Sequence, residues 1–330
     1  LLLKNFPDNE AISFALKELR QSNLDPLLYQ LTCFAIGGSQ SQCIDLNISQ
    51  SMAIRLILSQ LIPSSVIFLG IFLIIRQLWL LYKKVNKPWP EISAIPLSLL
   101  DMVLLIAGGF VLLGEVLSPL FSLTIIDNFF YGLPIALKES LKVFVGYLGM
   151  TIPPVFIFRR QLSNLQEKVI PANGWIQWKF RPINQAFFHA LQGWLIITPF
   201  VFLTSLIMNI FIGDPGGSNP LLEMVLSSKN FGALGIIFLT TSLMAPLFEE
   251  FLFRGVLLPV LVKKQGRIAG VIVSAFVFAL AHLSVGELAP LFVLGLGLGL
   301  LRLSSGRLFP CIIMHSLWNG ITFANLLLLS

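Results

Sequence analysis

The chain has 330 residues, of which 56% are hydrophobic and 12% are charged, whereas soluble domains carry about a quarter charged residues. This composition excludes an ordinary soluble protein and indicates an integral membrane protein. The formal net charge is +6, but the basic residues are sorted by membrane side and not gathered in a patch. We therefore expect a lipid bilayer as the surroundings and no nucleic-acid partner.

The chain opens with a more polar segment, residues 1–51, which we place on the non-cytoplasmic side. Within it, residues 9–23 have an apolar spacing compatible with a short amphipathic helix at the membrane interface. Cys33 and Cys43 could form a disulfide there or remain two free thiols. Because Leu1 is not a methionine, an anchor, a signal or a transit segment could precede it.

Apolar runs long enough to cross a hydrocarbon core of about 30 Å recur along the rest of the chain. They predict an all-α fold, a polytopic membrane bundle with about eight transmembrane helices. The predicted spans are 56–82, 98–126, 140–158, 186–213, 232–259, 268–285, 288–303 and 309–329. Nearly all unusual polar residues lie in the second half, so residues 52–230 should form accessory helices and residues 231–330 a functional core.

Basic residues follow the first, third, fifth and seventh predicted spans, while the intervening loops hold little net positive charge. By the positive-inside rule, these basic loops face the cytoplasm, or the stroma of a plastid, and both ends of the chain face the other side. The residues concerned are Lys83, Lys84, Lys87, Arg159, Arg160, Lys168, Lys179, Arg181, Lys263, Lys264, Arg267 and Arg307, with Arg302 just inside the seventh span.

Three ionisable side chains interrupt the fifth predicted span, in the stretch APLFEEFLFRG at residues 245–255. A charge at the centre of a membrane helix costs roughly 2.5–3.5 kcal/mol on insertion scales, so a pairing or a function must offset it. Glu250 and Arg254 are four residues apart on one helix face, and we expect an ion pair that braces the helix. Glu249 points toward another face and remains available for chemistry.

Two of the chain's three histidines lie in later spans. Phe278 and His282 are four residues apart in FVFALAH, and His315 and Asn319 are four apart in HSLWN, so each pair shares a helix face. Alone, each histidine is more typical of a satisfied core residue. Together with a free carboxylate they predict a functional cavity, because apolar spans have little structural use for such groups.

Two chemistries suit this set. In the first, Glu249 in a dry cavity is the general base for a water molecule, and His282 shares or relays the proton. His315 and Asn319 then offer hydrogen-bond donors to an oxyanion. In the second, Glu249, His282 and His315 hold one divalent metal such as zinc, with an open position for water. Both routes hydrolyse an amide, and the chain has no HExxH motif.

Three motifs follow one another on successive apolar segments and together resemble a known family. They are EExxxRG (Glu249, Glu250, Arg254, Gly255), FxxxH (Phe278, His282) and HxxxN (His315, Asn319). In this order they are similar to the CPBP family, also called the ABI or CAAX protease and bacteriocin-processing family, which includes the Ras-converting type of CAAX prenyl endopeptidase. The resemblance covers about residues 232–325.

The resemblance implies an intramembrane endopeptidase that acts in a cavity between helices on a membrane-associated or prenylated polypeptide. Carried over by position, Glu249 would activate water with the aid of His282. His315 and Asn319 would stabilise the oxyanion or contribute to a metal site. The residues expected to support them are Glu250, Arg254 and Phe278.

Two other functions remain open from the residues alone. A proton-coupled transporter would use membrane Glu and His side chains as a relay, although no internal repeat of the kind common in transporters is evident. A non-catalytic scaffold or complex subunit would keep such a core for stability. Glu115, in the second span, is expected to be satisfied by a neighbouring helix.

The predicted span edges place the three reactive residues at unequal depths. Counted from the cytoplasmic ends, His315, Glu249 and His282 lie about 9, 15 and 21 Å deep at 1.5 Å per residue. They can meet only if the edges differ from those predicted or if the helices tilt. Gly295 and Gly299 form a small-xxx-small pair that predicts close helix packing.

Overall fold

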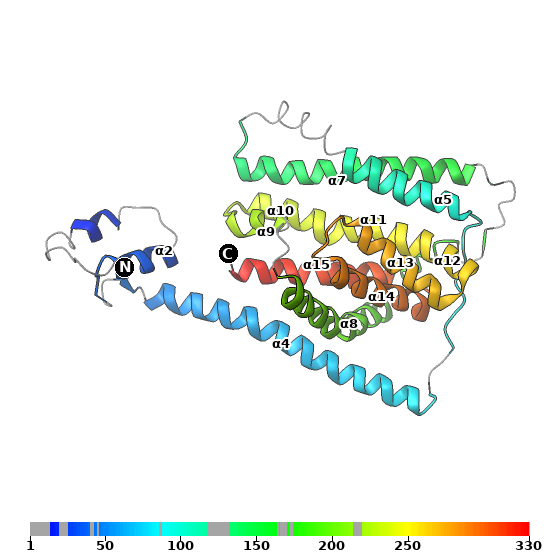
Figure 1. Ribbon diagram of the computed structural model, residues 1–330, viewed down its shortest axis with the longest axis horizontal. Coiled ribbons are helices and arrows are strands. Elements are labelled where there is room, and N and C mark those ends of the chain that lie inside the picture. The colour runs from blue at the N-terminus through cyan, green and yellow to red at the C-terminus, as the bar shows by residue number, and fades with distance from the viewer. Residues whose placement is uncertain are drawn as a thin grey trace. The chain divides into compact units, whose positions relative to one another are not determined.

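The computed structural model describes residues 14–19, 26–39, 43–44, 46–85, 88–117, 132–163, 165, 170–171, 174–213 and 220–329. Every long element in this part of the chain is a helix, which confirms the predicted all-α fold (Figure 1). The helices, with α for α-helical and η for π-helical segments, are α2 (Pro26–Ala35), α4 (Leu46–Tyr82), α5 (Leu99–Val103), η1 (Leu104–Leu117), α7 (Ile135–Ser163), α8 (Ile183–Ile212), α9 (Pro220–Ser227), α10 (Phe231–Leu239), η2 (Thr240–Met244), α11 (Ala245–Glu250), η3 (Phe251–Leu257), α12 (Leu258–Gln265), α13 (Arg267–Ala281), α14 (Leu288–Ser305) and α15 (Phe309–Leu329).

The described residues up to Ile62 form one compact unit, and those from Pro63 to Leu328 form a second. In the first unit, Cys33 and Cys43 are joined by a disulfide, so the pairing left open by the sequence is present. Leu16 and Leu19 pack around it. The amphipathic helix predicted over residues 9–23 is described only over 14–19, where the chain is helical, and its remainder lies outside the described residues.

Seven helices among the described residues are long and apolar enough to cross a membrane, which makes this an integral, multi-pass membrane protein. They are Ser49–Tyr82, Leu99–Leu117, Ile135–Ser163, Ile183–Phe211, Phe231–Gln265, Leu288–Ser305 and Phe309–Leu329. The remaining predicted span, 268–285, corresponds to the shorter α13 of 15 residues. The predicted end of the second span, beyond residue 117, lies outside the described residues.

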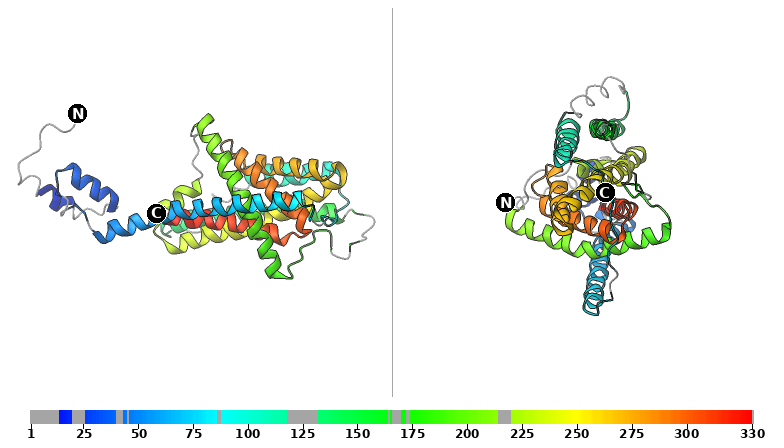
Figure 2. Two further views of the ribbon diagram at one scale, coloured as in Figure 1. Left: turned by 90° about the horizontal axis from the view of Figure 1, so that it is seen from below. Right: turned by 90° about the vertical axis from the view of Figure 1, so that its right-hand side faces the viewer.

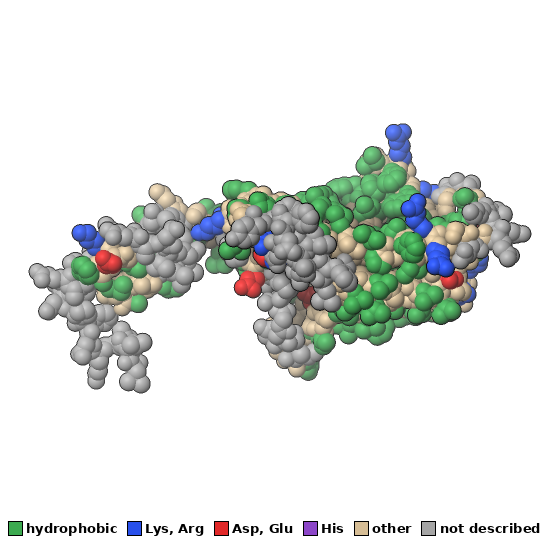
Figure 3. Space-filling view, turned by 90° about the horizontal axis from the view of Figure 1, so that it is seen from above, with side chains coloured by type: hydrophobic (Ala, Val, Ile, Leu, Met, Phe, Trp, Pro, Cys, Tyr) green, Lys and Arg blue, Asp and Glu red, His purple; other side chains and the backbone are tan. Residues whose placement is uncertain are grey.

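Large apolar side chains cover the outer faces of the spanning helices. Phe68 is 75% exposed and Phe156 is 66% exposed. Figure 3 shows such side chains as a broad band, with several lysines and arginines at its right-hand end. An apolar surface of this extent suits hydrocarbon and not water.

The helices of the second unit pack in pairs. η1 lies against α7, α7 against α10, α12 against α13, α13 against α14, and α14 against α8 (Figure 1). In both views of Figure 2, α8 crosses its neighbours steeply. The predicted small-residue contact is present, because a Cβ on Gly295 would lie 3.0 Å from Ala275 and one on Gly299 would lie 3.1 Å from Val271. α13 and α14 thus approach more closely than larger side chains would allow.

Two buried arginines fasten the segment 174–182 to the end of α14. Arg302 donates from Nη2 to the Ile176 carbonyl and to Gln177 Oε1, at 3.2 and 2.8 Å. Arg307 donates to the carbonyls of Lys179, Phe180 and Pro182. A segment without regular structure is thereby held in place through its backbone carbonyls.

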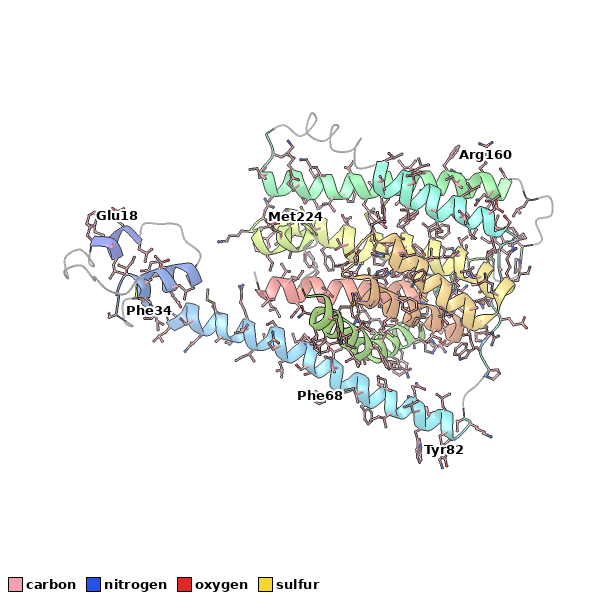
Figure 4. The ribbon with its side chains drawn as sticks, in the orientation of Figure 1. Glu18, Phe34, Phe68, Tyr82, Arg160 and Met224 are labelled. Carbon is pink, nitrogen blue, oxygen red and sulfur yellow. A yellow bond between two sulfur atoms is a disulfide. The ribbon has the colours of Figure 1, made fainter. Side chains whose placement is uncertain are left out.

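The basic helix ends lie together. Figure 4 places Tyr82, at the end of α4, and Arg160, near the end of α7, at one end of the spanning helices, and Met224 of α9 at the other. The last turn of α12 carries Lys263 and Lys264, and α12 lies toward the end of the bundle at which Figure 4 labels Arg160. Basic residues that the sequence analysis assigned to one side of the membrane therefore lie at one end of the helix bundle.

Candidate active site

Two glutamates lie on a long helix whose winding changes around them. The chain is helical from Phe231 to Gln265, and α11, which carries Glu249 and Glu250, lies between the π-helical segments η2 and η3. π-Helical turns are rare and often mark functional sites. In η2 the N–H of Ala245 donates to the Thr240 carbonyl, five residues back. Pro246 comes next and has no N–H, so the Thr241 carbonyl loses its corresponding helix partner.

Asn319 of α15 supplies the missing donor. Its Nδ2 donates to the Thr241 carbonyl at 2.8 Å. A side-chain amide has two N–H donors, so this bond leaves one for another acceptor. The oxyanion role expected for Asn319 would fall to that second N–H, while the first one braces the helix that carries Glu249.

Glu250 and Arg254 form the predicted ion pair in a fully buried position. Arg254 Nη1 lies 2.9 Å from Glu250 Oε1, and both side chains are 0% exposed. The same Oε1 lies 2.9 Å from His315 Nδ1. Arg254 also donates from Nη2 to the Gly295 carbonyl at 3.2 Å. The pair therefore links the fifth spanning helix to α15 through Glu250 and to α14 through Arg254. The sequence predicted the contact between Glu250 and Arg254 but not the one with His315.

Phe278 lies at the centre of these groups. Its ring is 4.2 Å from the Arg254 guanidinium carbon, at the distance of a cation–π contact. Its centroid is 4.7 Å from the His282 ring and 5.9 Å from the His315 ring, both edge to face. One buried phenyl ring thus fixes the planes of both imidazoles.

Both imidazoles direct Nε2 toward Glu249. Nδ1 of His282 lies 2.8 Å from the Phe278 carbonyl, which can only accept, so this nitrogen carries a proton. Nδ1 of His315 is likewise the donor to Glu250. In the neutral rings Nε2 then holds the lone pair, and these nitrogens lie 3.8 Å (His282) and 3.9 Å (His315) from Glu249 Oε2. Three polar atoms from three helices converge.

Exposure differs across the site. The side chain of Glu249 is 11% exposed and that of His282 is 26% exposed, whereas those of His315 and Glu250 are 4% and 0% exposed. Glu249 and His282 therefore form the accessible side. The inner side is formed by Glu250, Arg254 and His315, which hold one another in orientation and are shielded from solvent.

The donor atoms of Glu249, His282 and His315 are of the type that zinc sites use. In the part of the chain that the structure describes, however, no group of three or more His, Cys, Asp or Glu side chains is arranged to hold a metal ion.

Two further residues border the site, and neither was assigned to it from the sequence. Tyr147 of α7 donates from its hydroxyl to the Ala245 carbonyl, one turn before Glu249, at 3.3 Å. Glu115 of η1 lies close enough to interact electrostatically with both Glu249 and Tyr147. The expectation that a neighbouring helix satisfies Glu115 stays a prediction. The only sequence signal was a carboxylate inside an apolar span.

Comparisons with known proteins identify two regions. Residues 231–321 match the family model described as type II CAAX prenyl endopeptidase Rce1-like. Residues 1–54 match a domain of unknown function (DUF8675). No curated protein and no solved structure matches the chain.

Proposed function

We propose, from the premise that residues 231–321 form an Rce1-like type II CAAX prenyl endopeptidase domain, that the protein is an intramembrane endopeptidase whose water molecule is activated by Glu249. One observation carries the proposal. The Nε2 atoms of His282 and His315 face the same carboxylate oxygen at 3.8 and 3.9 Å. These separations are too long for direct hydrogen bonds and suit one water shared by the three groups.

The reaction begins with that water. Glu249 takes one proton while the water oxygen attacks the carbonyl carbon of the peptide bond. Nε2 of His282 accepts the other hydrogen and orients the oxygen. As the C–N bond then breaks, the proton that Glu249 took from the water passes to the departing nitrogen, which leaves as an amine. Little bulk water reaches the inner side, so these groups act at low dielectric, where they are strongest.

The carbonyl oxygen becomes negative in the intermediate and needs donors. Asn319 offers its second N–H without any change of state. His315 donates its Nδ1 proton to Glu250, so it can serve the oxyanion only as an imidazolium, which carries a second proton on Nε2. Asn319 is therefore the donor that the neutral site already provides.

The proposed substrate is a polypeptide that reaches the site from the membrane, and a prenylated CAAX tail is the class that the domain's description names. The accessory helices between Pro63 and residue 231 would then position this substrate. The basic helix ends support an orientation in which that end of the bundle faces the cytoplasm or the stroma, with the N- and C-termini opposite.

The test is Glu249→Gln, which keeps shape and removes the base. Purified wild-type protein should cleave at least one peptide in a panel of farnesylated and unmodified CAAX reporters, and Glu249→Gln should lose that cleavage by at least about 10²-fold. Glu91→Gln, at an exposed position, is the matched control and should cleave normally. Both variants should retain the wild-type melting temperature.

Equal cleavage by Glu249→Gln and wild type would refute the proposal. A phenotype that survives Glu249→Ala would favour the scaffold reading, and a proteoliposome flux that Glu249→Gln abolishes would favour the transporter. Metal content and the effect of a chelator on cleavage test the alternative, metal-dependent mechanism. Stoichiometric metal that is lost in His282→Ala would assign Glu249, His282 and His315 to a divalent ion such as zinc.

A further inference from the structure

The fifth spanning helix carries a second proline, Pro259, which lies beyond the two glutamates as Pro246 lies before them. η3 ends where the N–H of Leu258 donates to the Phe253 carbonyl, five residues back. This bond takes the donor that the Arg254 carbonyl would have in an α-helix. The donor that it would have in a π-helix belongs to residue 259, and proline has no N–H. The Arg254 carbonyl is therefore left without a partner in its own helix.

A side chain from α14 supplies the missing donor. Arg302 donates from Nε to the Arg254 carbonyl at 3.2 Å. The break at the other proline is repaired in the same way, by the bond from Asn319 of α15 to the Thr241 carbonyl. The stretch 241–254, which carries both glutamates, is thus held to a neighbouring helix at each end by a side-chain donor.

An arginine is an expensive residue for this position. The side chain of Arg302 is fully buried, and its acceptors among the described residues are two backbone carbonyls and one amide oxygen, with no carboxylate. Its Nη1 has no partner there. A buried charge without an opposite charge costs far more than an apolar side chain of similar size. The hydrogen bonds are therefore what the arginine contributes, and one of them goes to the helix of the glutamates.

Arg254 connects this bond to the candidate active site. Its guanidinium lies 2.9 Å from Glu250 Oε1, and the same oxygen lies 2.9 Å from His315 Nδ1. The other nitrogen of that ring faces Glu249. A shift of the Arg254 backbone would therefore move the carboxylate that orients His315. Arg302 touches none of the reacting groups and acts on them only through this chain of contacts.

We propose that Arg302 is a positioning residue of the candidate active site, because it replaces the N–H that Pro259 lacks and so fixes the backbone of Arg254. The carboxylate of Glu250 and the ring of His315 are oriented through that backbone. This inference rests on the proposed endopeptidase function. Loss of the bond should slow the chemical step and leave substrate binding unchanged.

The test is rescue by a restored N–H. Arg302→Lys keeps the charge but puts a methylene where Nε was, so kcat for the cleaved farnesylated reporter should fall by about 10-fold while KM stays unchanged. Pro259→Ala gives the Arg254 carbonyl a donor in its own helix. In that background Arg302→Lys should lower kcat by less than about 3-fold. An equal loss in both backgrounds would overturn the proposal.

Arg307→Lys is the matched control. It likewise replaces an Nε–H, which here donates to the Lys179 carbonyl at 2.9 Å. The side-chain hydrogen bonds of Arg307 go to residues 179–185 and not to the fifth spanning helix, so this variant should keep wild-type kcat. An equal fall of kcat in Arg302→Lys and Arg307→Lys would contradict the positioning role.

The same variants separate this inference from the proposed function. Wild-type kcat in Arg302→Lys, alongside an inactive Glu249→Gln, would remove the role of Arg302 and leave the endopeptidase function intact. Cleavage that survives in Glu249→Gln would instead refute the endopeptidase function. Melting temperatures in detergent need no substrate, and Arg302→Lys should lower them less in the Pro259→Ala background than in the wild type. Additive melting-temperature shifts would refute the exchange of donors on which the proposal depends.

Discussion

Glu250 shows how one residue can matter more for orientation than for stability. Its Oε1 accepts from both Arg254 and His315, while Glu250 Oε2 and Arg254 Nε have no hydrogen-bond partner among the described residues. A buried pair that is only partly satisfied contributes little to stability relative to apolar residues of the same size. Its clear effect is to fix which nitrogen of His315 carries the proton.

Removing one partner of this pair should therefore cost more than removing both. Arg254→Leu leaves the fully buried Glu250 unpaired, and the free energy of unfolding should fall by about 3–5 kcal/mol. The double variant Glu250→Leu with Arg254→Leu should recover most of this loss but no activity, because His315 loses its acceptor. Thermal melting in detergent and reporter cleavage measure the two effects. A single variant as stable as wild type would contradict the pairing argument.

At the residue scale, the sequence predicted the members of the motifs because they are spaced by one helical turn. That spacing is local, so Glu250 with Arg254 and Phe278 with His282 could be paired without a structure. Glu115 and Tyr147 could not be placed, since their position depends on how η1 and α7 pack against the fifth spanning helix. No local pattern records that packing.

Among the elements, the break in the hydrogen-bond ladder of the fifth spanning helix gives a direct test. Pro246→Ala restores an N–H that can donate to the Thr241 carbonyl, the acceptor now served by Asn319. Asn319→Leu should lower stability by about 1–3 kcal/mol in the wild type, because a buried carbonyl is left unpaired, and by clearly less in the Pro246→Ala background. A double-mutant cycle of melting temperatures measures this coupling. Additive effects would contradict the proposed exchange of donors.

The observed helix ends explain why the sequence predicted unequal membrane depths for Glu249, His282 and His315. The fifth helix runs to Gln265 and not to residue 259, so Glu249 lies about 24 Å from its end, level with His282 at about 22 Å from the start of α13. α15 begins where Leu308 and Phe309 donate to the carbonyls of Gln177 and Trp178. Its start is thus covered by the segment 174–182, and depth counted from it is not depth in the membrane. Such loop contacts are tertiary and leave no trace in hydropathy.

For the whole molecule, the matched domain and the candidate site do not coincide. The domain at residues 231–321 supplies Glu249 and both imidazoles, whereas η1 and α7, which precede it, supply Glu115 and Tyr147. The general class, an all-helical membrane protein, followed from composition alone, since a chain with so few charges can satisfy its backbone in lipid only through helices or closed barrels.

The short α13 has a consequence for the surrounding lipid. With 15 residues it is about 22 Å long, less than the hydrocarbon thickness of about 30 Å, and it stops at Ala281, immediately before His282. Acyl chains around it must compress, at a fraction of a kcal/mol per Å of mismatch. Cleavage per molecule should therefore rise in proteoliposomes made from shorter-chain phospholipids and fall in longer-chain ones. A rate indifferent to chain length would mean that protein, and not lipid, covers the chain around the end of α13.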